Sequence, residues 1–342
     1  MQNGSDCIRE IFMEREEGFL SPYATKTKDT KGREHYCEPC PNRTEYQRDR
    51  DRIIHSQSFR RLMYKTQVFL APVGDHYRTR LTHTLEVSQI ARTMARALRL
   101  NEDLTEAAAL GHDLGHTPFG HAGEDALQKI YSPDFTHYKQ SLRVVEKLEN
   151  DGAGLNLTWE VRDAILNHTG DCVASTPEGV LIKLADRIAY INHDIDDARR
   201  AGILKESDIP VDICRVLGYS HSQRINTMVT SVISSSMDSG EMKMSPEVHE
   251  ATMKLRKFLF EYVYHNPIAK SQENKSKDLV SALFDYYVKN PDKMPPLHKR
   301  MMADGVDPER CACDFIAGMT DRYAIEVYNE LFVPRVWRAI HE

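Results

Sequence analysis

The sequence predicts an all-α protein, on three observations. Apolar residues recur every three or four positions along most of the chain, which is the spacing of one buried helix face. Runs in which apolar and polar residues alternate, as in half-buried strands, are almost absent. Helix-start residues precede clear apolar patterns, as Thr82 and as Thr176-Pro177. The 342 residues, 41% hydrophobic and 28% charged, have the composition of an ordinary globular chain.

The N-terminal part is expected to hold an arm and then the first long helix. From Gly18 to Thr44 the chain is polar and broken by prolines and a glycine, which predicts an extended arm. Thr82 is the predicted N-cap of the helix. The buried face of that helix is expected to carry His83, Val87, Ile90, Met94 and Ala97. This pattern places an imidazole among apolar side chains.

The later helices follow from the same kind of pattern. A short helix is expected over 104–112, where a segment rich in glycine begins. Thr176-Pro177 supplies a cap and a proline at the first helical position, and this helix is expected to run to Gly202. Residues 227–247 are expected to form a helix end and a loop, with further helices over 248–264, 276–289 and 308–331.

Charge and cysteine content limit the partners and the compartment. The formal net charge of −6 taken alone disfavours nucleic acid, anionic membrane or another polyanion as a partner. Seven cysteines, an odd number, favour a reducing compartment, and the N-terminus shows no apolar signal-peptide region, so we expect a cytoplasmic protein. No apolar run approaches the length of a membrane span. A four-thiolate zinc site is possible if Cys37 and Cys40 pair with Cys311 and Cys313. The alternative is that these cysteines are unlinked reduced thiols.

Histidines are concentrated in one stretch of the chain. Eight of the 15 fall between residues 55 and 168: His55, His76, His83, His112, His116, His121, His137 and His168. His112-Asp113 stands where the short apolar helix ends, and Asp186 belongs to the long helix that follows Pro177. A buried histidine or aspartate is costly unless it is paired or ligated. With His83 these residues would form a metal site of two imidazoles and two carboxylates, although each alone reads equally as a satisfied core or surface residue.

Nine motifs give the chain a resemblance to a known family. They are Arg48-Asp-Arg-Asp-Arg-Ile-Ile-His55, Phe59-Arg-Arg-Leu62, Lys65-Thr-Gln-Val68, Arg80-Leu-Thr-His83, His112-Asp-Leu-Gly-His-Thr-Pro-Phe-Gly-His-Ala-Gly-Glu124, Gln140-Ser141, Asn167-His168-Thr169-Gly170, Ala185-Asp186-Arg187-Ile188-Ala189-Tyr190 and Phe315-Ile-Ala-Gly-Met-Thr-Asp-Arg-Tyr323. The chain resembles the HD-domain metal-dependent phosphohydrolases, with their H…HD…D signature. It is most similar to the family of deoxyguanosine triphosphate triphosphohydrolase-like proteins, over roughly residues 46–335.

The resemblance implies a domain organisation. It predicts an HD-domain helical bundle with additional C-terminal helices. Residues 1–45 would be an N-terminal arm, 46–202 the HD-type catalytic core, and 203–342 a helical C-terminal part that packs on the core.

The resemblance also implies a metal and a reaction. Its metal ligands would be His83, His112, Asp113 and Asp186. Nitrogen and oxygen ligands together suit a divalent ion such as Mn²⁺, Mg²⁺, Fe²⁺, Co²⁺, Ni²⁺ or Zn²⁺, and the sequence does not select among them. The implied activity is attack of a metal-activated water at the α-phosphorus of a deoxynucleoside triphosphate, which releases deoxynucleoside and tripolyphosphate.

Further residues match family positions that move a proton or touch the phosphates. His121 and Glu124 would share one helix face if the chain re-enters a helix after Gly120. In the family the matching pair does the proton work, so His121 is the expected general acid and Glu124 the residue that holds it. His116 and His137 match positions that touch the phosphates, and Arg80 matches a phosphate-binding arginine.

The deoxyribose is expected to meet a stripe on the long helix. Asp186, Tyr190 and Asp194 are spaced four apart and therefore lie on one face. Tyr190 would contact the sugar and leave no room for a 2′-hydroxyl, and Asp194 would accept a hydrogen bond from the 3′-hydroxyl. Gln67 matches a family glutamine that also faces the 3′-hydroxyl. Tyr190 as plain core packing is the alternative.

Residues 43–99 carry a local excess of positive charge, with twelve Lys or Arg against five Asp or Glu. This stretch is either an ion-paired surface or a wall for a triphosphate. It could also hold a regulatory deoxynucleoside triphosphate at a boundary of the homo-oligomer that the resemblance implies. The competing functions are HD-type hydrolysis of another nucleotide, and a nucleotide- or single-stranded-DNA-binding regulator with little catalysis. Weak or no nucleic-acid binding and no membrane contact are expected.

Overall fold

The chain folds into an all-α body, as predicted. The computed structural model describes residues 7–67, 78–237, 239–264 and 267–334, with the backbone alone for 267–271. This described part contains sixteen α-helices and no β-strand, and its helices are joined by short 3-10 and π turns. None of the helices described is long and apolar enough to cross a membrane. Val68 and His76, named above, lie outside the described residues.

One hydrophobic core lies under the helices that precede and follow the histidine-rich segment. It is formed by apolar side chains such as Ile53, Leu104 and Ile165, all fully buried. Each such side chain contributes about 1.5–3 kcal/mol by leaving water. The helices around this core are α2 (Glu45–Ile54), α3 (Gln57–Arg61), α5 (Glu102–Gly111), α7 (His137–Arg143) and α8 (Trp159–Asn167).

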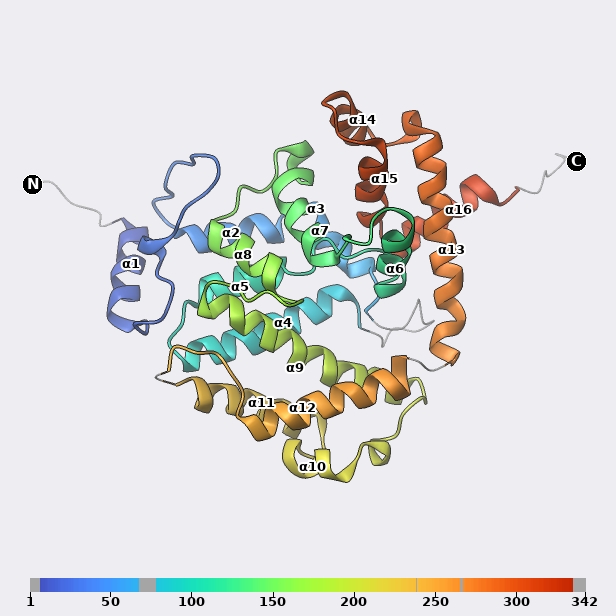
Figure 1. The fold of residues 1–342 in the computed structure, drawn as a ribbon. Helices are drawn as coiled ribbons and strands as arrows, with labels where there is room; N and C mark the ends of the chain where they lie inside the picture. Colours follow the sequence, from blue (N-terminus) through green and yellow to red (C-terminus); the bar gives the residue numbers. More distant parts are fainter. Residues whose placement is uncertain (1–6, 68–77, 238, 265–266, 335–342) are drawn as a thin grey trace, which may run out of the picture.

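A second core surrounds the longest helix, α9 (Pro177–Arg200), which runs through the middle of the body in Figure 1. Thr176 accepts a hydrogen bond from the backbone of Gly179 and starts this helix as predicted. The partner α4 (Arg80–Ala97) packs along α9, and α11 (His221–Ser236) and α12 (Pro246–Leu259) also pack against α9. The remaining members of this layer are α10 (Val211–Leu217), α11 (His221–Ser236) and α12 (Pro246–Leu259), the last continuing as a π turn over Phe260–Tyr264.

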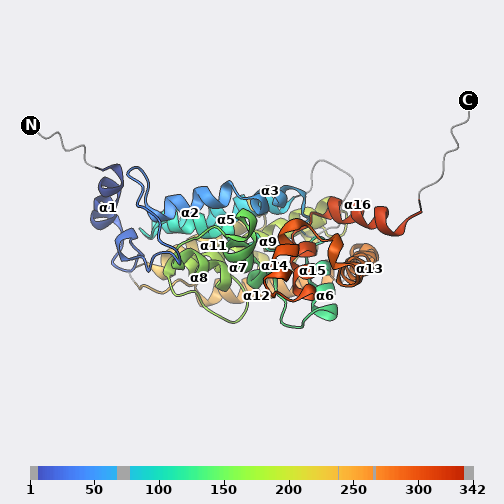
Figure 2. The ribbon, with the colours of Figure 1, turned by 90° about the horizontal axis from the view of Figure 1, so that it is seen from above.

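The third core joins the C-terminal helices to the histidine-rich segment. Figures 1 and 2 show α13–α16 gathered at one end of a flat body, next to α6. Leu127 of α6 packs there with Leu283 of α13 and Ile316 of α15. The helices are α6 (His121–Ile130), α13 (Pro267–Lys289), α14 (Pro296–Ala303), α15 (Pro308–Ala317) and α16 (Asp321–Phe332).

The N-terminal arm lies against the core and does not extend into solvent. It begins with α1 (Ile8–Phe19) and continues as a loop. Thr25 donates through its backbone and its hydroxyl to the buried carboxylate of Glu178. Arg33 pairs with the buried Asp49 and donates to the backbone carbonyl of Asn156. The predicted division into residues 1–45, 46–202 and 203–342 stays a prediction. The second core, around α9, includes residues from both sides of residue 202.

Some local predictions were wrong. The helix that holds His83 starts at Arg80, because Thr79 and Thr82 cap each other reciprocally and Thr79 is the N-cap. The helix predicted over 308–331 is two helices, since α15 ends at Ala317 and Thr320 caps α16. Ala97, predicted on the buried face of the helix that holds His83, is exposed. The prediction of a helix end and a loop over 227–247 is confirmed, because α11 ends at Ser236 and the next helix begins at Pro246.

Candidate metal centre and active site

His112 and Asp113 follow directly after α5, where the sequence predicted the end of a short helix. Asn101 accepts a hydrogen bond from the backbone of Leu104 and starts α5. At its far end Gly111 lies so close to α8 that a Cβ there would stand 2.7 Å from the Cδ1 of Ile165. The close packing buries both His112 and Asp113 in the interior.

The hydrogen bond of His112 leaves one ring nitrogen free for a ligand. Its Nδ1 lies 2.7 Å from the carbonyl oxygen of Ala109. Because a carbonyl only accepts, Nδ1 carries the proton and Nε2 presents its lone pair. In the described part of the chain this buried Nε2 has no hydrogen-bond partner. It lies 3.7 Å from the Oδ2 of Asp113.

Helix packing brings His83 and Asp186 to the same place. The Nε2 of His83, on α4, lies 3.1 Å from the Oδ1 of Asp186, on α9. Burial raises the pKa of Asp186, but the hydrogen bond and charge of His83 outweigh it, and the pKa falls to about 2. The His83 and His112 rings meet edge to face, with centroids 5.6 Å apart.

The four predicted ligands therefore converge, and their donor atoms fit a divalent ion. Ligand atoms of His83, His112 and Asp113 all lie within 4.8 Å of one another, and Asp186 contacts His83. Imidazole nitrogens with carboxylate oxygens suit divalent transition metals or Mg²⁺. A four-thiolate site receives no support, because the clusters of metal-binding side chains found among the described residues contain no cysteine.

Arg80 contacts a predicted metal ligand. Its Nη1 donates to the Oδ2 of Asp113 at 2.5 Å, and both side chains are buried. Burial raises the pKa of Asp113, but His112 and Arg80 outweigh it and hold the pKa well below its usual range. The Nε of Arg80 has no partner among the residues described. The structure thus places this predicted phosphate ligand against a carboxylate that is predicted to bind the metal.

Glu124 contacts two histidines, whereas the sequence suggested only one. Its Oε2 lies 3.3 Å from the Nδ1 of His121, on the first turn of α6. Its Oε1 accepts from the backbone nitrogen of His137 at 2.8 Å and from the Nδ1 of His137 at 3.0 Å. Burial raises the pKa of Glu124, but the hydrogen bonds from both imidazoles outweigh it and depress the pKa strongly. The carboxylate is therefore a fixed anion between two imidazoles.

His121 and His137 differ in exposure. The His121 side chain is 80% exposed and that of His137 is 14% exposed. Burial lowers the pKa of His137, but the Glu124 carboxylate outweighs it and raises that pKa. His121 can therefore meet a substrate from solvent, while His137 is part of the wall.

His116 links this carboxylate to the metal donors. Its ring stacks on His137 with centroids 4.7 Å apart, and burial followed by the charge of Arg80 lowers its pKa well below the ordinary value. Ligand atoms of Asp113, His116 and His137 form a cluster of their own within 4.8 Å. A continuous row of imidazoles thus connects Asp113 to Glu124.

His168 belongs to this row, although the sequence assigned it no role. Its ring is 5.0 Å from that of His112 and 5.5 Å from that of His137, measured between centroids. Its Nδ1 contacts the carbonyl of Ile165 at 2.7 Å, three residues back, as in His112. Burial lowers the pKa of His168 to about 3, so the ring is neutral. The sequence feature that could have indicated this position is that His168, like His112, directly follows a helix with an apolar face.

The backbone before His121 is held in an unusual conformation. Phe119 and Gly120 both have positive φ, of 61° and 59°, and only glycine adopts the second conformation easily. The nitrogen of Phe119 donates to the Oδ1 of Asp321 at 2.9 Å. Asp321 also accepts from the backbone and hydroxyl of Thr66. The start of α16 therefore fixes the loop that presents His121.

Lys65 makes a second connection to the C-terminal helices. It is fully buried, and its Nζ donates to the carbonyls of His116 and Ala317. Burial, with the charge of Arg61, lowers the pKa of Lys65 to about 7. Lys65 and Thr66, neighbours in the motif Lys65-Thr-Gln-Val68, thus connect the histidine-rich segment to α15 and α16.

The predicted sugar-binding stripe is present on α9, but α12 and its π turn cover part of it. The hydroxyl of Tyr190 accepts from the Nε of Arg256 at 2.8 Å. Asp194 is buried and accepts from the hydroxyl of Tyr264. Burial raises the pKa of Asp194 to about 7. Arg256 and Tyr264 were missed, because nothing local in the sequence connects them to α9.

Two of the residues predicted to contact the sugar keep a polar atom without a hydrogen-bond partner in the described part of the chain. These atoms are the Oδ1 of Asp194 and the Oε1 of Gln67. Both atoms are buried.

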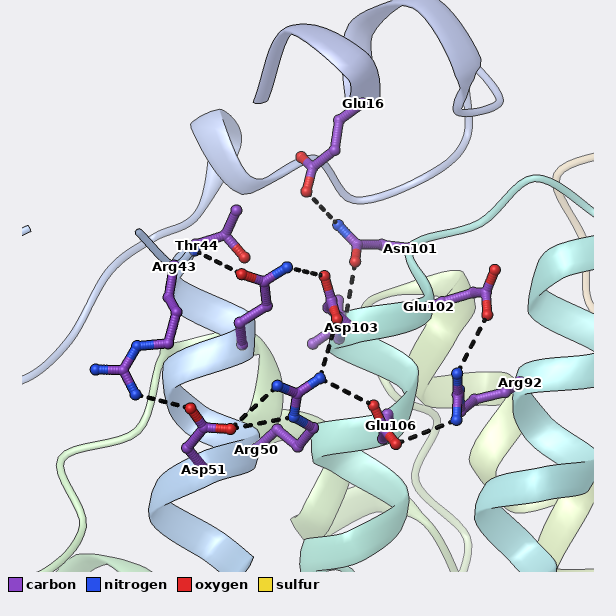
Figure 3. Close-up of polar contacts among 12 residues, drawn as sticks. Glu16, Arg43, Thr44, Arg50, Asp51, Arg92, Asn101, Glu102, Asp103 and Glu106 are labelled. Atoms are coloured by element: carbon purple, nitrogen blue, oxygen red, sulfur yellow. Dashed lines mark hydrogen bonds and ion pairs between the residues drawn. The ribbon is translucent and has the colours of Figure 1, made fainter. Parts of the chain in front are cut away.

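Much of the basic stretch is ion-paired on the surface. Figure 3 shows Arg43, Arg50 and Arg92 alternating with acidic side chains across α2, α5 and α4. Asp51 binds Arg43 and Arg50, and Glu106 binds Arg50 and Arg92, at 2.7–3.3 Å. For these arginines the structure favours the ion-paired reading over a wall for phosphates.

Comparisons with known proteins agree with this geometry. The HD domain family matches residues 80–191, and the phosphohydrolase-associated domain family matches residues 242–330. A deoxyguanosinetriphosphate triphosphohydrolase-like protein of Caldanaerobacter subterraneus subsp. tengcongensis is 58% identical over 96% of this chain and 97% of its own. Proteins of the same description from Desulfatibacillum aliphaticivorans and Clostridium perfringens are 50% and 47% identical, over 96% of this chain and 98% of their own.

The helical fold and the converging H…HD…D donors define an HD-domain phosphohydrolase. The chain belongs to the family of deoxyguanosinetriphosphate triphosphohydrolase-like proteins. A solved hypothetical protein of Aquifex aeolicus overlaps 85% of this chain and 69% of its own at 19% identity, with a TM-score of 0.47, and adds nothing to this assignment.

Proposed function

We propose that this hydrolase cleaves deoxynucleoside triphosphates at the α-phosphorus into deoxynucleoside and tripolyphosphate. One observation carries the proposal: the donors His83, His112 and Asp113 adjoin the Glu124 carboxylate and its two imidazoles through a row of buried histidines. Such a site combines a place for a metal with a group that can transfer a proton. The names of the relatives supply the nucleotide class.

The ion would be held by His83, His112, Asp113 and Asp186. A divalent ion there would act as a Lewis acid on a phosphoryl oxygen and lower the pKa of a bound water. Mn²⁺, Mg²⁺, Fe²⁺, Co²⁺, Ni²⁺ and Zn²⁺ all remain open. The carbonyl of Ala109 binds the Nδ1 of His112, so the Nε2 is the ring nitrogen left for the ion.

His121 is the proposed general acid. It is the exposed imidazole of the row, and its Nδ1 faces the Glu124 carboxylate. Glu124 holds the ring through its Nδ1, so the Nε2 would be the atom that gives a proton to the departing 5′ oxygen as the bond to phosphorus breaks. A positioned acid of this kind contributes about 10²- to 10⁴-fold in rate. His137 binds the other oxygen of Glu124 and so holds the carboxylate in place.

His116, His137 and Arg80 are the proposed contacts of the triphosphate. His116 and His137 cluster with Asp113, and His137 also contacts Glu124. Arg80 contacts Asp113, so all three adjoin the predicted metal ligands. The guanidinium of Arg80 has an unpaired Nε beside its contact with Asp113. It can therefore hold a phosphate oxygen and orient a metal-binding carboxylate together.

The sugar is proposed to lie on the stripe formed by Tyr190 and Asp194, with Gln67 facing it. Asp194 keeps a free Oδ1 for the 3′-hydroxyl, while Tyr264 binds its other oxygen. Arg256 fixes the hydroxyl of Tyr190, so the ring has a defined position beside the sugar. A rigid ring there would exclude a 2′-hydroxyl and select deoxyribose.

Product analysis tests the proposal directly. Purified protein with Mn²⁺ or Mg²⁺ is incubated with each of the four deoxynucleoside triphosphates, and the products are separated by ion-exchange chromatography. Deoxynucleoside and tripolyphosphate in equal amounts are expected, with no turnover in Asp113→Ala. Monophosphate with pyrophosphate, or full activity in Asp113→Ala, would refute the proposed reaction.

We also propose a cytoplasmic homo-oligomer that can bind a regulatory deoxynucleoside triphosphate. The seven cysteines are all unpaired, as a reducing compartment requires. Light scattering on the protein as it elutes from a sizing column measures the oligomeric state, and a monomer under all conditions would contradict the oligomer. The rate of hydrolysis is measured with and without a second deoxynucleoside triphosphate, and a rate that does not depend on it would contradict the regulation.

A further inference from the structure

Cys37, in the loop of the N-terminal arm, lies against two guanidinium groups. Its Sγ is 2.7 Å from the Nη2 of Arg48 and 3.3 Å from the Nη2 of Arg52. Both arginines lie on α2, four residues apart, so their side chains project from one face. Cys37 is partly exposed, which leaves the sulfur open to a small reagent.

The two arginines are fixed by other contacts, so this cationic environment is built into the fold. The Nη1 of Arg52 donates to the carbonyls of Leu155 and Asn156 at 2.8 and 2.6 Å. The Nη1 of Arg48 donates to the carbonyl of Glu38 at 2.8 Å, directly after Cys37. A fixed positive charge beside a thiol favours the thiolate, which is the nucleophilic form.

Cys40 follows three residues later and has its own arginine. Arg43 is hydrogen-bonded to the Cys40 thiol and paired with Asp51 at 2.7 Å, the second contact being visible in Figure 3. The segment from Cys37 to Cys40 is irregular and contains Pro39, so helix geometry does not hold the two cysteines apart. A spacing of Cys-X-X-Cys is short enough for a disulfide to close.

The cysteine pKa values agree with this arrangement. Burial raises the pKa of Cys37, but the charges of Arg48 and Arg52 outweigh it and leave the pKa below its ordinary value. The hydrogen bond from Arg43 lowers the pKa of Cys40. Burial instead raises the pKa of Cys311 to about 11 and that of Cys313 to about 12.

We propose that Cys37 and Cys40 form a redox-active dithiol that reduces low-molecular-weight disulfides. The Cys37 thiolate attacks one sulfur of the disulfide, which forms a mixed disulfide and expels the other half as a thiolate. The Cys40 thiolate then attacks the Cys37 sulfur, which closes the Cys37–Cys40 bond and expels the second thiolate. The two protein thiols lose two electrons and the small disulfide gains them. The proposal does not depend on the function of the histidine site.

Cys172 provides an internal reference for the test. It is exposed and lies on the loop before α9, and Cys37 is less exposed than Cys172. The whole protein is alkylated briefly with iodoacetamide at about pH 6.5 and at about pH 9, and each cysteine peptide is quantified by mass spectrometry. We expect Cys37 to react faster than Cys172 at the lower pH, and we expect the ratio of the two rates to fall at the higher pH. An equal or slower rate for Cys37 at the lower pH would overturn the proposal.

Variants separate the charge effect from simple exposure. Arg48→Gln removes one guanidinium and leaves the backbone contacts of Arg52 intact, so the chain should keep its circular dichroism spectrum. Its ratio of Cys37 to Cys172 alkylation at the lower pH should fall, whereas Arg60→Gln, on an exposed arginine of α3, should leave the ratio unchanged. An unchanged ratio in Arg48→Gln would contradict the role of the guanidinium.

The disulfide step is tested with oxidised glutathione. In the native chain, the peptide that contains both cysteines should lose its two thiol hydrogens. In Cys40→Ser the same treatment should trap a glutathione mixed disulfide on Cys37. If glutathione instead stays on Cys37 in the native chain, or if Cys172 is modified first, the dithiol proposal is wrong.

Discussion

The carboxylate of Asp321 accepts a hydrogen bond from the backbone nitrogen of Phe119 at 2.9 Å, across 202 residues of sequence. Phe119 has a positive φ and stands two residues before His121. Asp321→Ala would leave this nitrogen and both donors of Thr66 unpaired. We expect kcat to fall by about tenfold or more, since a loss of 1.4 kcal/mol in transition-state stabilisation has that effect.

Asp321 is a positioning residue, so its effect must differ from general destabilisation. Mn²⁺ affinity, measured by calorimetry, should not change in Asp321→Ala, because no metal donor contacts Asp321. Asp321→Asn keeps an acceptor for Phe119 and should recover part of kcat. Glu326→Ala, at an exposed site on the same helix, is the matched control. A parallel loss of metal affinity and kcat would argue against positioning.

Glu124→Gln should separate proton transfer from binding. The amide keeps the shape but removes the anion that His121 and His137 share. We expect kcat to fall by about 10²-fold or more while KM changes little. His121→Gln should cost a similar factor, and the double variant should cost little more than either single one. His249→Gln, on an exposed histidine of α12, is the control, and additive losses would contradict a shared role.

Asp186→Asn tests the metal centre without an assay of activity. The carbonyl oxygen of the amide can still accept the hydrogen bond from His83, but the negative charge is lost. Mn²⁺ affinity should fall by about 10-fold or more. Added Mn²⁺ should raise the melting temperature of the native chain, because it binds only the folded state, and this increase should shrink in the variant. An undiminished increase would place the ion elsewhere. Asp278→Asn, on the exposed side of α13, is the control.

Lys65 should make stability depend on alkaline pH. Its pKa is about 7 in the folded chain and near 10.5 when unfolded, so unfolding takes up a proton between these values. The free energy of unfolding contributed by Lys65 therefore rises with pH from about 7 to 10. Lys65→Met should reduce this slope in urea titrations and cost about 1–3 kcal/mol for each carbonyl left unpaired. Lys129→Met, at an exposed site, should do neither, and an equal slope in native chain and Lys65→Met would refute the assignment.

Asp194 should report on the 3′-hydroxyl of the sugar. The native enzyme is expected to prefer a deoxynucleoside triphosphate over its 2′,3′-dideoxy analogue, because Asp194 and its partner Tyr264 would be left without the hydroxyl. In Asp194→Ala the ratio of kcat/KM between the two substrates should approach one. A ratio that stays at the native value would remove Asp194 from the sugar site.

The fold class was predictable, because it depends on local pattern, and the residues predicted as metal ligands lie close together in the structure. The end of the short helix before His112-Asp113 and the stripe on α9 follow from helix periodicity and from residues within one or two turns. The break between α15 and α16 was missed because the apolar spacing of a helix continues across it. Thr320 is the N-cap of α16, but a single threonine in the sequence does not outweigh a continuous apolar pattern.

The partners of the donor residues were much less predictable. Glu124 was expected to bind His121, at i+3, and the structure adds His137, thirteen residues away. Arg80 was expected to bind phosphate, and the structure places it on Asp113. His168 looked like one histidine among many until helix packing placed it between His112 and His137.

The sequence by itself determined the all-α fold class and the family to which the chain belongs, and it predicted a set of metal ligands. Only the tertiary structure decided that Asp321 reaches Thr66 across 255 residues and that Tyr264 covers Asp194. The physical reason is that helix periodicity orients a side chain relative to its own axis only. The choice of partner depends on how separate helices pack, which is set by the shape of the buried cores.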